Sequence, residues 1–314
     1  MEIEQTNTVS FARVLQGLVV EMRPKEWAKN LLVFSGLIFS RSLFEHNNLL
    51  LSLGGFAAFC LVSSGIYFFN DLCDINEDKL HPIKKNRPIA SGVLNLNLAR
   101  IVMVLLFTGG SALALSLNYP FACAVAIYLT FSLGYSLGLK NLVILDVLII
   151  SCGFVIRAIA GALVLQVEAS AWLVLCTSMV ALLVGFGKRR HELVLLEENA
   201  GSHRASLNDY SLQFLDSMMT ICAGAAVVCY ALYTMSEDTV ARFHTRNLLI
   251  TLPFVIYGVF RYLFLIHKRK AGGDPVQLLF RDRPTLLNIL LWIIAVCLVI
   301  YLPKAWQFSL NVIR

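Results

Sequence analysis

Three aspartates directly follow an apolar run in the first third of the chain. Asp71, Asp74 and Asp78 lie within YFFNDLCDINEDKLHPIKKNRPIASG, residues 67–92. Their spacing of i, i+3 and i+7 places the three carboxylates on one face if the helix continues, so they would converge within a few ångströms. That convergence is costly, because like charges repel and screening water is partly excluded at the end of a membrane helix. Mg²⁺ removes this cost, since it binds one or two carboxylates together with water and phosphate oxygens. We therefore predict all three aspartates to be metal ligands and catalytic residues.

The basic residues that follow the aspartates indicate what the metal would carry. Lys84, Lys85 and Arg87 stand in the same stretch and would bind the remaining charge of a diphosphate. Asn70 adds an amide that would orient a carboxylate or contact phosphate. The alternative is a solvated acidic loop whose charge the nearby lysines balance. The spacing and the apolar approach favour a magnesium–diphosphate site.

The rest of the chain consists mainly of apolar spans. The composition is 58% hydrophobic and 15% charged, against about 45–50% and about 25% in soluble domains. The pattern predicts an all-α membrane protein with about nine transmembrane helices, since runs of about 20 apolar residues recur. The eight cysteines are scattered without CxxC spacing and are expected to be small apolar side chains. The expected spans are roughly 27–45, 49–69, 98–117, 120–139, 142–166, 169–187, 212–235, 247–266 and 285–306, of which the first is the weakest.

The distribution of charge predicts the orientation in the membrane. With these spans, 19 Lys and Arg residues fall on the side of the N-terminus and five on the other side. The positive-inside rule then predicts a cytoplasmic N-terminus and an external C-terminus. Most of the loop acids, the three aspartates included, fall on the cytoplasmic side too, so any chemistry is expected to face the cytoplasm of an inner-membrane protein. We expect a cytoplasmic segment at 1–22 and one transmembrane catalytic domain at 23–314, with site loops at about 70–97 and 187–211.

Two ionisable side chains fall inside the fifth expected span. Asp146 and Arg157 are 11 residues apart, so they share a helix face but are too distant to pair directly. Charges inside a membrane usually face the bundle interior or a wet cavity. Arg157 is therefore either a structural anchor or a pocket residue, and Arg261 and Asp216 pose the same question, with structure favoured.

Several stretches together carry a resemblance to a known family. NDLCDINED followed by RPIASG resembles the first aspartate motif of the UbiA superfamily of intramembrane prenyltransferases, and Tyr135, Ser136, Leu139 and Lys140 match its Y-S-x-x-L-K pattern. The stretches RPKEWAKN, GFVIRAIAG, GKRRHEL and LFRDRPTLL are similar to one branch, the decaprenyl-phosphate phosphoribosyltransferases. The superfamily's second D-x-x-x-D motif is absent, and GKRRHELVLLEENAG supplies Glu192 and Glu197 instead.

The resemblance implies a fold, a reaction and a cofactor. The fold would be a UbiA-like bundle with an Mg²⁺–diphosphate site at its cytoplasmic end. The reaction would move 5-phosphoribosyl from phosphoribosyl diphosphate to a polyprenyl phosphate, here decaprenyl, and release diphosphate. The product would be a lipid-linked arabinose precursor for the cell envelope. The other partner is the bilayer itself; no nucleic acid is expected, and the oligomeric state is left open.

This reaction needs more cations than one with an aromatic acceptor, because both substrates bring phosphate. The acceptor's phosphate oxygen is already a nucleophile, so no strong general base is required. Lys188, Arg189 and Glu192 share a helix face, as site residues or as a structural salt bridge. Besides the three aspartates, the predicted catalytic residues are Lys29 and Arg157. The predicted substrate-binding residues are Lys25, Asn70, Lys84, Lys85, Arg87, Tyr135, Lys140, Lys188, Arg189, Glu192 and Tyr210.

Two other functions fit parts of the sequence. A UbiA-type prenyltransferase acting on an aromatic or haem-like acceptor would use the same aspartates, but the W-x-K-N start and the surplus of lysines disfavour it. A transporter or flippase would carry polar residues at the membrane midplane and inverted repeats. Here the charge gathers at one surface.

Overall fold

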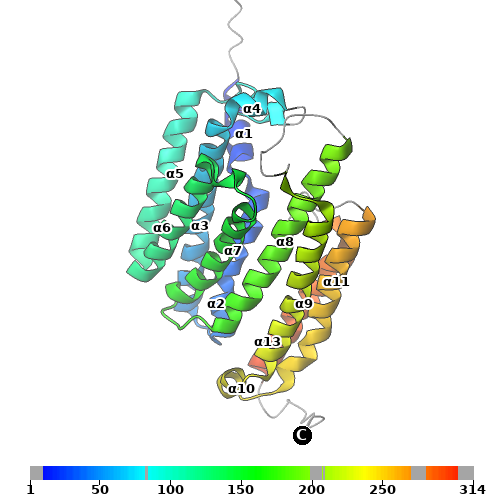
Figure 1. Cartoon of the computed structure of the whole chain (residues 1–314). Helices are drawn as coiled ribbons and strands as arrows, with labels where there is room; N and C mark the ends of the chain where they lie inside the picture. The colour runs from blue at the N-terminus through cyan, green and yellow to red at the C-terminus, as the bar shows by residue number, and fades with distance from the viewer. Residues whose placement is uncertain (1–9, 82–83, 199–206, 208, 270–280, 303–314) are drawn as a thin grey trace, which may run out of the picture.

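The computed structural model is a bundle of helices (Figure 1). It describes residues 10–81, 84–198, 207, 209–269 and 281–302, and in these residues the regular structure is entirely helical. Eight helices are long and apolar enough to cross a membrane. The all-α architecture predicted from the sequence is therefore confirmed. The long helices are α3 (His46–Cys73), α5 (Leu96–Leu117), α6 (Tyr119–Leu137), α7 (Leu145–Val164), α8 (Ala171–Glu198), α9 (Leu212–Met235), α11 (Leu252–Arg269) and α13 (Arg283–Tyr301).

Shorter helices connect the long ones or cover their ends. The helix α1 ends at Met22, where the expected N-terminal segment also ends. That residues 1–22 form a cytoplasmic segment separate from the transmembrane domain stays a prediction. The expected site loop at 187–211 is wrong in its first half, because residues 187–198 continue α8 as helix. The shorter elements are α1 (Phe11–Met22), η1 (Pro24–Val33), α2 (Phe34–Phe39), α4 (Ile75–Leu80), η2 (Lys84–Asn86), η3 (Leu139–Asn141), α10 (Glu237–Phe243) and η5 (Asn247–Thr251).

The first expected span, 27–45, is not one long helix. It consists of the 3₁₀-helix η1 and the short helix α2, which run antiparallel to α3. Trp27 donates to Ser64 and Asn30 donates to Ser63, so residues further along η1 contact residues nearer the start of α3. With rises of about 2.0 Å and 1.5 Å per residue, the two pieces together reach roughly 29 Å, close to the thickness of a bilayer's hydrocarbon core. The described chain therefore passes along the bundle nine times, eight of them as long α-helices.

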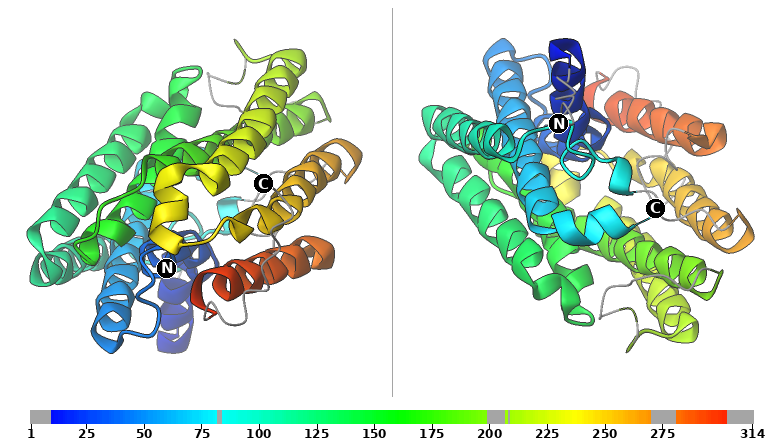
Figure 2. Two further views of the ribbon diagram at one scale, coloured as in Figure 1. Left: turned by 90° about the horizontal axis from the view of Figure 1, so that it is seen from below. Right: turned by 90° about the horizontal axis from the view of Figure 1, so that it is seen from above.

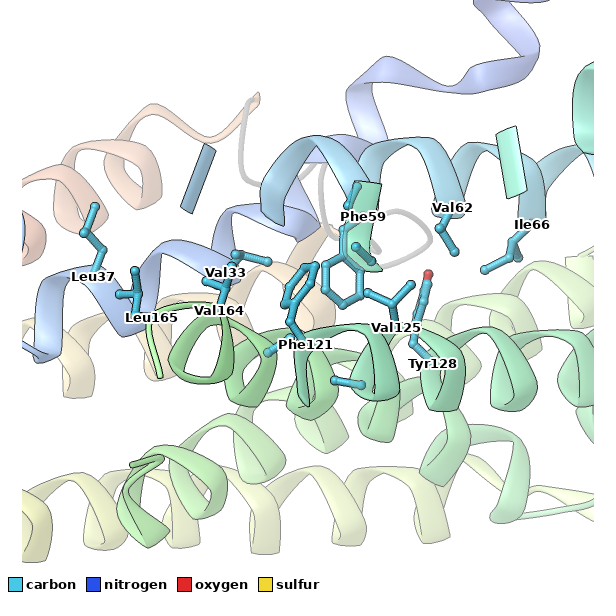
Figure 3. Close-up of a cluster of buried hydrophobic side chains, with 14 residues drawn as sticks. Val33, Leu37, Phe59, Val62, Ile66, Phe121, Val125, Tyr128, Val164 and Leu165 are labelled. Atoms are coloured by element: carbon cyan, nitrogen blue, oxygen red, sulfur yellow. The ribbon is translucent and has the colours of Figure 1, made fainter. Parts of the chain in front are cut away.

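The central helices of the bundle are α3 and α7. In each, 56% of an 18-residue apolar stretch is buried inside the bundle, against 17–33% in the other six membrane-spanning helices. Their main shared core is aromatic and aliphatic, and Figure 3 shows Phe59 between Phe121 and Tyr128. The ring centroid of Phe59 lies 5.8 Å from that of Phe121 and 5.4 Å from that of Tyr128, within the range of favourable aromatic pairs. This packing fixes α3, whose last turn carries Asp71, against α6 and α7.

Two glycines let the backbones of α2 and α7 touch. A Cβ on Gly161 would lie 2.1 Å from the carbonyl oxygen of Val33, and one on Gly36 would lie 2.1 Å from the carbonyl oxygen of Gly161. Small residues at membrane helix contacts allow this close approach. The short α2 therefore packs against α7 through its backbone.

The aspartate end of α3 lies at one end of the bundle. Figure 1 shows α4 at this end, together with the C-terminal end of α8. Viewed along the bundle in the right panel of Figure 2, α4 lies near the middle of this end with other helices around it. The residues that carry chemistry in the sequence are therefore grouped at one end.

Candidate functional site

Asp71 and Asp78 meet on a single guanidinium group. Arg87 Nη1 donates to Asp71 Oδ1 at 3.0 Å and to Asp78 Oδ2 at 2.6 Å. Both carboxylates are almost fully buried, at 1% exposure each, whereas a quarter of the Arg87 side chain is exposed. Asp71 stands in the last turn of α3, and Asp78 follows in α4, so the chain brings the two acids to opposite sides of one cation.

Asp74 faces another part of the bundle. The helix α3 ends at Cys73, and Asp74 lies between it and α4 with φ −92° and ψ 10°. Its carboxylate accepts from Lys140 Nζ at 2.6 Å and from Asn70 Nδ2 at 3.1 Å. Asn70 Nδ2 also donates to Asp71 Oδ1 at 3.4 Å, so Asn70 lies between Asp71 and Asp74, but the three carboxylates do not all meet on one cation. The helix does not continue unbroken, and Lys140 draws the Asp74 carboxylate towards the end of α6.

Arg23 and Glu21 complete the site, and the sequence did not indicate either residue. Arg23 ends α1 in the left-handed conformation (φ 52°), and its Nη2 lies 2.5 Å from Asp71 Oδ2. Its guanidinium also stacks over the ring of Tyr67, 4.7 Å from the centroid. Asp71 therefore has a guanidinium on each of its two oxygens. The only sequence signal for Arg23 is its place at the start of the RPKEWAKN stretch.

Glu21 is a buried carboxyl beside Asp71. It is 1% exposed, and its Oε1 has no hydrogen-bond partner among the described residues. Burial, a hydrogen bond with Asp71 and the negative charge of Asp71 together raise the pKa of Glu21 to about 9. Glu21 is therefore neutral at pH 7 and adds no charge to the site. A cavity of about 250 Å³ opens here, lined by Val20, Glu21, Arg23, Asp71, Asn86, Arg87 and Pro88.

The acid and bases further along this stretch differ in burial, since Asp78 is buried and Lys84 is partly exposed. Burial raises the pKa of Asp78 above its ordinary value, more than Arg87 lowers it. Lys84 Nζ lies 4.0 Å from Asp78. Lys85 and Lys25 are exposed. The structure thus brings Lys84 and Arg87 to the aspartates and leaves Lys85 and Lys25 at the surface of the same end.

A second group of cations lies along η1, α7 and α8. Lys29 forms an ion pair with Glu26 and lies within electrostatic reach of Arg157. Lys188, which is partly buried, lies within electrostatic reach of Lys29 and of Glu192. These three predicted site residues therefore share one region of the bundle.

Arg157 is held by uncharged partners. Its three nitrogens donate to Asn30 Oδ1 at 2.7 Å, to the Gly153 carbonyl at 2.7 Å and to Tyr128 Oη at 2.6 Å. Its guanidinium lies 4.4 Å from the centroid of the Tyr128 ring. Of the two interpretations of Arg157, this geometry supports the anchor, because each of its three side-chain nitrogens donates a hydrogen bond inside the bundle.

Arg189 belongs to a buried network of ion pairs. It is 0% exposed, and its guanidinium lies 2.5 Å from both Asp146 and Glu192. It also donates to Tyr135 Oη at 2.8 Å. Tyr210 Oη donates to Asp146 at 2.8 Å and accepts from the backbone N–H of Ile144. Arg189 and Glu192 therefore form the salt bridge that was one of the two interpretations of this pair. A role of Arg189, Glu192, Tyr135 and Tyr210 in substrate binding stays a prediction.

Two further charged residues named from the sequence, Asp216 and Arg261, form ion pairs away from this region. Asp216 pairs with Arg190, and Arg261 pairs with Asp282 at the start of α13. Asp209 is exposed. The side chain of Glu197 lies outside the described residues.

The residues present fit a magnesium ion through two carboxylates. Asp71 and Asp78 each have an oxygen within 3.0 Å of the same Arg87 nitrogen, so one cation between them could reach both. Hard carboxylate oxygens completed by water and phosphate are the ligands that Mg²⁺ takes. In the part of the chain that the structure describes, there is no group of three His, Cys, Asp or Glu side chains placed to hold a metal. The fit is therefore to a pair of protein ligands, Asp71 and Asp78, and the metal role of Asp74 stays a prediction.

A polytopic helical bundle with aspartates at one end defines the class of protein, and comparison with known proteins gives the family. The model of the UbiA prenyltransferase family matches residues 31–281. The chain belongs to this family and is an integral-membrane enzyme of the UbiA superfamily.

Relatives in sequence and in structure support this assignment. The chain is 33% identical to a decaprenyl-phosphate phosphoribosyltransferase of Mycolicibacterium smegmatis, over 92% of this chain and 93% of the relative. It is 30% identical to the enzyme of the same name from Corynebacterium glutamicum, over 91% and 87%. A digeranylgeranylglyceryl phosphate synthase structure matches with TM-score 0.67 and 18% identity, over 92% of this chain and 99% of that chain. A UbiA homologue from Archaeoglobus fulgidus bound to GPP and Mg²⁺ matches with TM-score 0.66 and 17% identity, over 91% and 100%.

Proposed function

We propose that this enzyme transfers 5-phosphoribosyl from phosphoribosyl diphosphate to a polyprenyl phosphate and releases diphosphate. The observation that carries the proposal is the 33% identity, over nearly the whole length of both chains, to a protein named for this reaction. Decaprenyl phosphate is the acceptor that the relatives' name implies. The product would be a lipid-linked arabinose precursor for the cell envelope.

The chemistry makes one bond and breaks one. An oxygen of the acceptor phosphate donates an electron pair to C1 of ribose, and the bond from C1 to the diphosphate oxygen breaks. The diphosphate leaves with the electrons of that bond, while positive charge develops on the sugar ring. Mg²⁺, held by Asp71 and Asp78, would neutralise the leaving diphosphate.

The chain's own residues supply the rest of the site. Arg23, Arg87 and Lys84 would bind phosphate oxygens at the aspartates. Lys29 in η1 and Lys188 in α8 would add positive charge on the side of the site formed by these two elements. Three phosphate-bearing groups arrive in this reaction, namely the donor's diphosphate, its 5-phosphate and the acceptor's phosphate. The number of cations around the site supports a reaction of this kind over one with an uncharged aromatic acceptor.

The active-site end would face the cytoplasm of an inner membrane. The support is the excess of Lys and Arg on the side of the aspartates, 19 against five. Phosphoribosyl diphosphate is a water-soluble, highly charged molecule, so a site open to the cytoplasm would meet it directly.

The proposal is tested with purified protein, labelled phosphoribosyl diphosphate and decaprenyl phosphate. We expect a charged glycolipid product, loss of the reaction on chelation of divalent ions, and a fall of about 100-fold or more in kcat for Asp71→Asn. Asp216→Asn is the control, since it removes an acid that pairs with Arg190 and His267. Consumption of an isoprenyl diphosphate with an aromatic acceptor, and no turnover of phosphoribosyl diphosphate, would overturn the proposal in favour of a prenyltransferase.

A further inference from the structure

Arg87 occupies the place that a bridging metal would need. Its Nη1 lies between Asp71 Oδ1 and Asp78 Oδ2, at 3.0 and 2.6 Å. Arg23 Nη2 takes the other oxygen of Asp71 at 2.5 Å. A divalent cation on these oxygens and the two guanidiniums in these positions exclude each other, because they would overlap and carry charge of the same sign. Binding of a metal by Asp71 and Asp78 therefore requires the arginines to move.

The arginines are the more exposed members of this cluster. Their side chains are 27% and 25% exposed, for Arg23 and Arg87, whereas the side chains of Asp71 and Asp78 are 1% and 2% exposed. Both arginines line the cavity of about 250 Å³ beside the aspartates. A guanidinium that leaves a carboxylate here turns into open space and is not forced through packed side chains.

A phosphate group is the natural new partner for such a guanidinium. Arginine binds phosphate in the same fork geometry that it uses for a carboxylate, and it stays charged at any physiological pH. The exchange also conserves charge pairing at each centre. The two carboxylates exchange two guanidinium partners for one divalent cation, and the arginines exchange carboxylate oxygens for phosphate oxygens.

We propose that Arg87, assisted by Arg23, is an exchangeable counter-ion that holds Asp71 and Asp78 in place and then turns to the donor's diphosphate when the metal binds. The inference rests on the proposed function, in that the incoming group is a metal diphosphate. It adds Arg23 to the donor site and gives Arg87 two successive partners. Metal alone would have to displace Arg87 without offering it a phosphate, so metal and diphosphate bind cooperatively.

The exchange predicts opposite effects of one substitution on two affinities. In Arg87→Gln, Mn²⁺ alone is expected to bind about threefold to tenfold more tightly, because no guanidinium competes for the carboxylates. Diphosphate in the presence of Mn²⁺ is expected to bind about tenfold more weakly, because a charge-assisted hydrogen bond is lost. Arg23→Gln, which frees only Asp71, is expected to change both affinities in the same directions by less.

The experiment measures Mn²⁺ binding by electron paramagnetic resonance and inorganic diphosphate binding by calorimetry on the purified full chain. Arg190→Gln is the matched control, since it also breaks an ion pair between an arginine and an aspartate but lies on Asp216. It should change neither affinity. Thermal unfolding of each variant shows that the fold is retained.

Two outcomes separate this inference from the proposed function. If Mn²⁺ alone binds Arg87→Gln no more tightly than wild type while diphosphate binding falls, Arg87 is a phosphate ligand without exchange and the inference is wrong. If the wild type shows the exchange but transfers an isoprenyl group and no phosphoribosyl group, the proposed function fails and the exchange stands.

Discussion

Arg157 and Arg189 are both buried in the bundle, but their partners differ in charge. Arg189 lies between Asp146 and Glu192. Arg157 donates only to uncharged groups, and within the described residues no carboxylate lies within ion-pair distance of it. A buried cation without an acid partner raises the positive potential around it. Arg157 therefore favours the presence of an anion nearby while its own donors stay engaged in the fold.

Arg157→Met is expected to lower stability by about 2–4 kcal/mol, because it removes three hydrogen bonds from a charged group and strands Asn30 Oδ1. The measurement is the Tm of the purified protein in detergent. Arg100→Met is the control, since Arg100 is exposed and its side chain donates to exposed Asn97. An unchanged Tm for Arg157→Met would contradict the anchoring role and return Arg157 to the pocket.

The sequence predicts Asp71, Asp78 and Arg87 but not Arg23 or Glu21. Asp71 and Asp78 stand out because their spacing and apolar approach are local features. Arg23 escapes prediction because its contact with Asp71 joins residues 48 positions apart. Asp146 poses the same difficulty, since its partner Arg189 lies on another helix and the sequence offers only Arg157 on the same face. Contacts of this kind depend on tertiary packing, which periodicity does not contain.

At the scale of elements, α2 and α7 contact each other through their backbones. Gly36 and Gly161 leave each backbone room for the other, and a Cβ at either position would meet main-chain atoms that have no way to rotate aside. Helices in a membrane gain their attraction from such close packing, because lipid tails are as apolar as the side chains. The position of η1, and with it Asn30 and Trp27, depends on this contact.

Gly161→Ala is expected to destabilise the protein by more than about 3 kcal/mol, since overpacking against backbone costs at least the upper end of the usual range. Gly109→Ala in α5 is the matched control. A Cβ there meets nothing within 4 Å, so alanine should be neutral or stabilise by up to about 1 kcal/mol. The measurement is again the Tm in detergent. Equal behaviour of the two variants would show that α2 and α7 do not touch as described.

The elements also show where reading the sequence succeeds. Seven of the eight long spans could be placed to within about five residues, because runs of apolar residues of helical length have no other stable form in a bilayer. The span expected at 169–187 begins correctly but ends too early, because α8 continues through the charged stretch to Glu198. The span at 27–45 could not be placed in this way, because its apolar core is short and a 3₁₀-helix reaches further per residue than the α-helix that the prediction assumes.

At the scale of the whole molecule, the charged residues of the site share one end of the bundle. The aspartates, Lys140 and the network around Arg189 lie at the ends of α3, α6 and α8, which Figure 1 shows at the same end. The cysteines allow a test of which side of the membrane this end of the bundle faces. All eight are free thiols, and Cys73 is the exposed one, directly between Asp71 and Asp74.

A membrane-impermeant maleimide is expected to modify Cys73 in inside-out vesicles and not in intact spheroplasts, because the site should face the cytoplasm. Cys73→Ser is the control and should remove the labelling. Modification of Cys73 in intact spheroplasts with sealed membranes would place the aspartate end outside and would overturn the orientation drawn from the loop charges.

The winding of η1 sets the level at which α1 meets α3. Ten residues in 3₁₀ form rise about 0.5 Å more per residue than in α form, which amounts to roughly 5 Å over Pro24–Val33. With Val33 fixed against Gly161, an α-helical η1 would draw Arg23 that far below Asp71, beyond the reach of its ion pair. A stretched helix thus acts as a spacer, and its rise per residue rather than its number of residues decides that Arg23 arrives at Asp71.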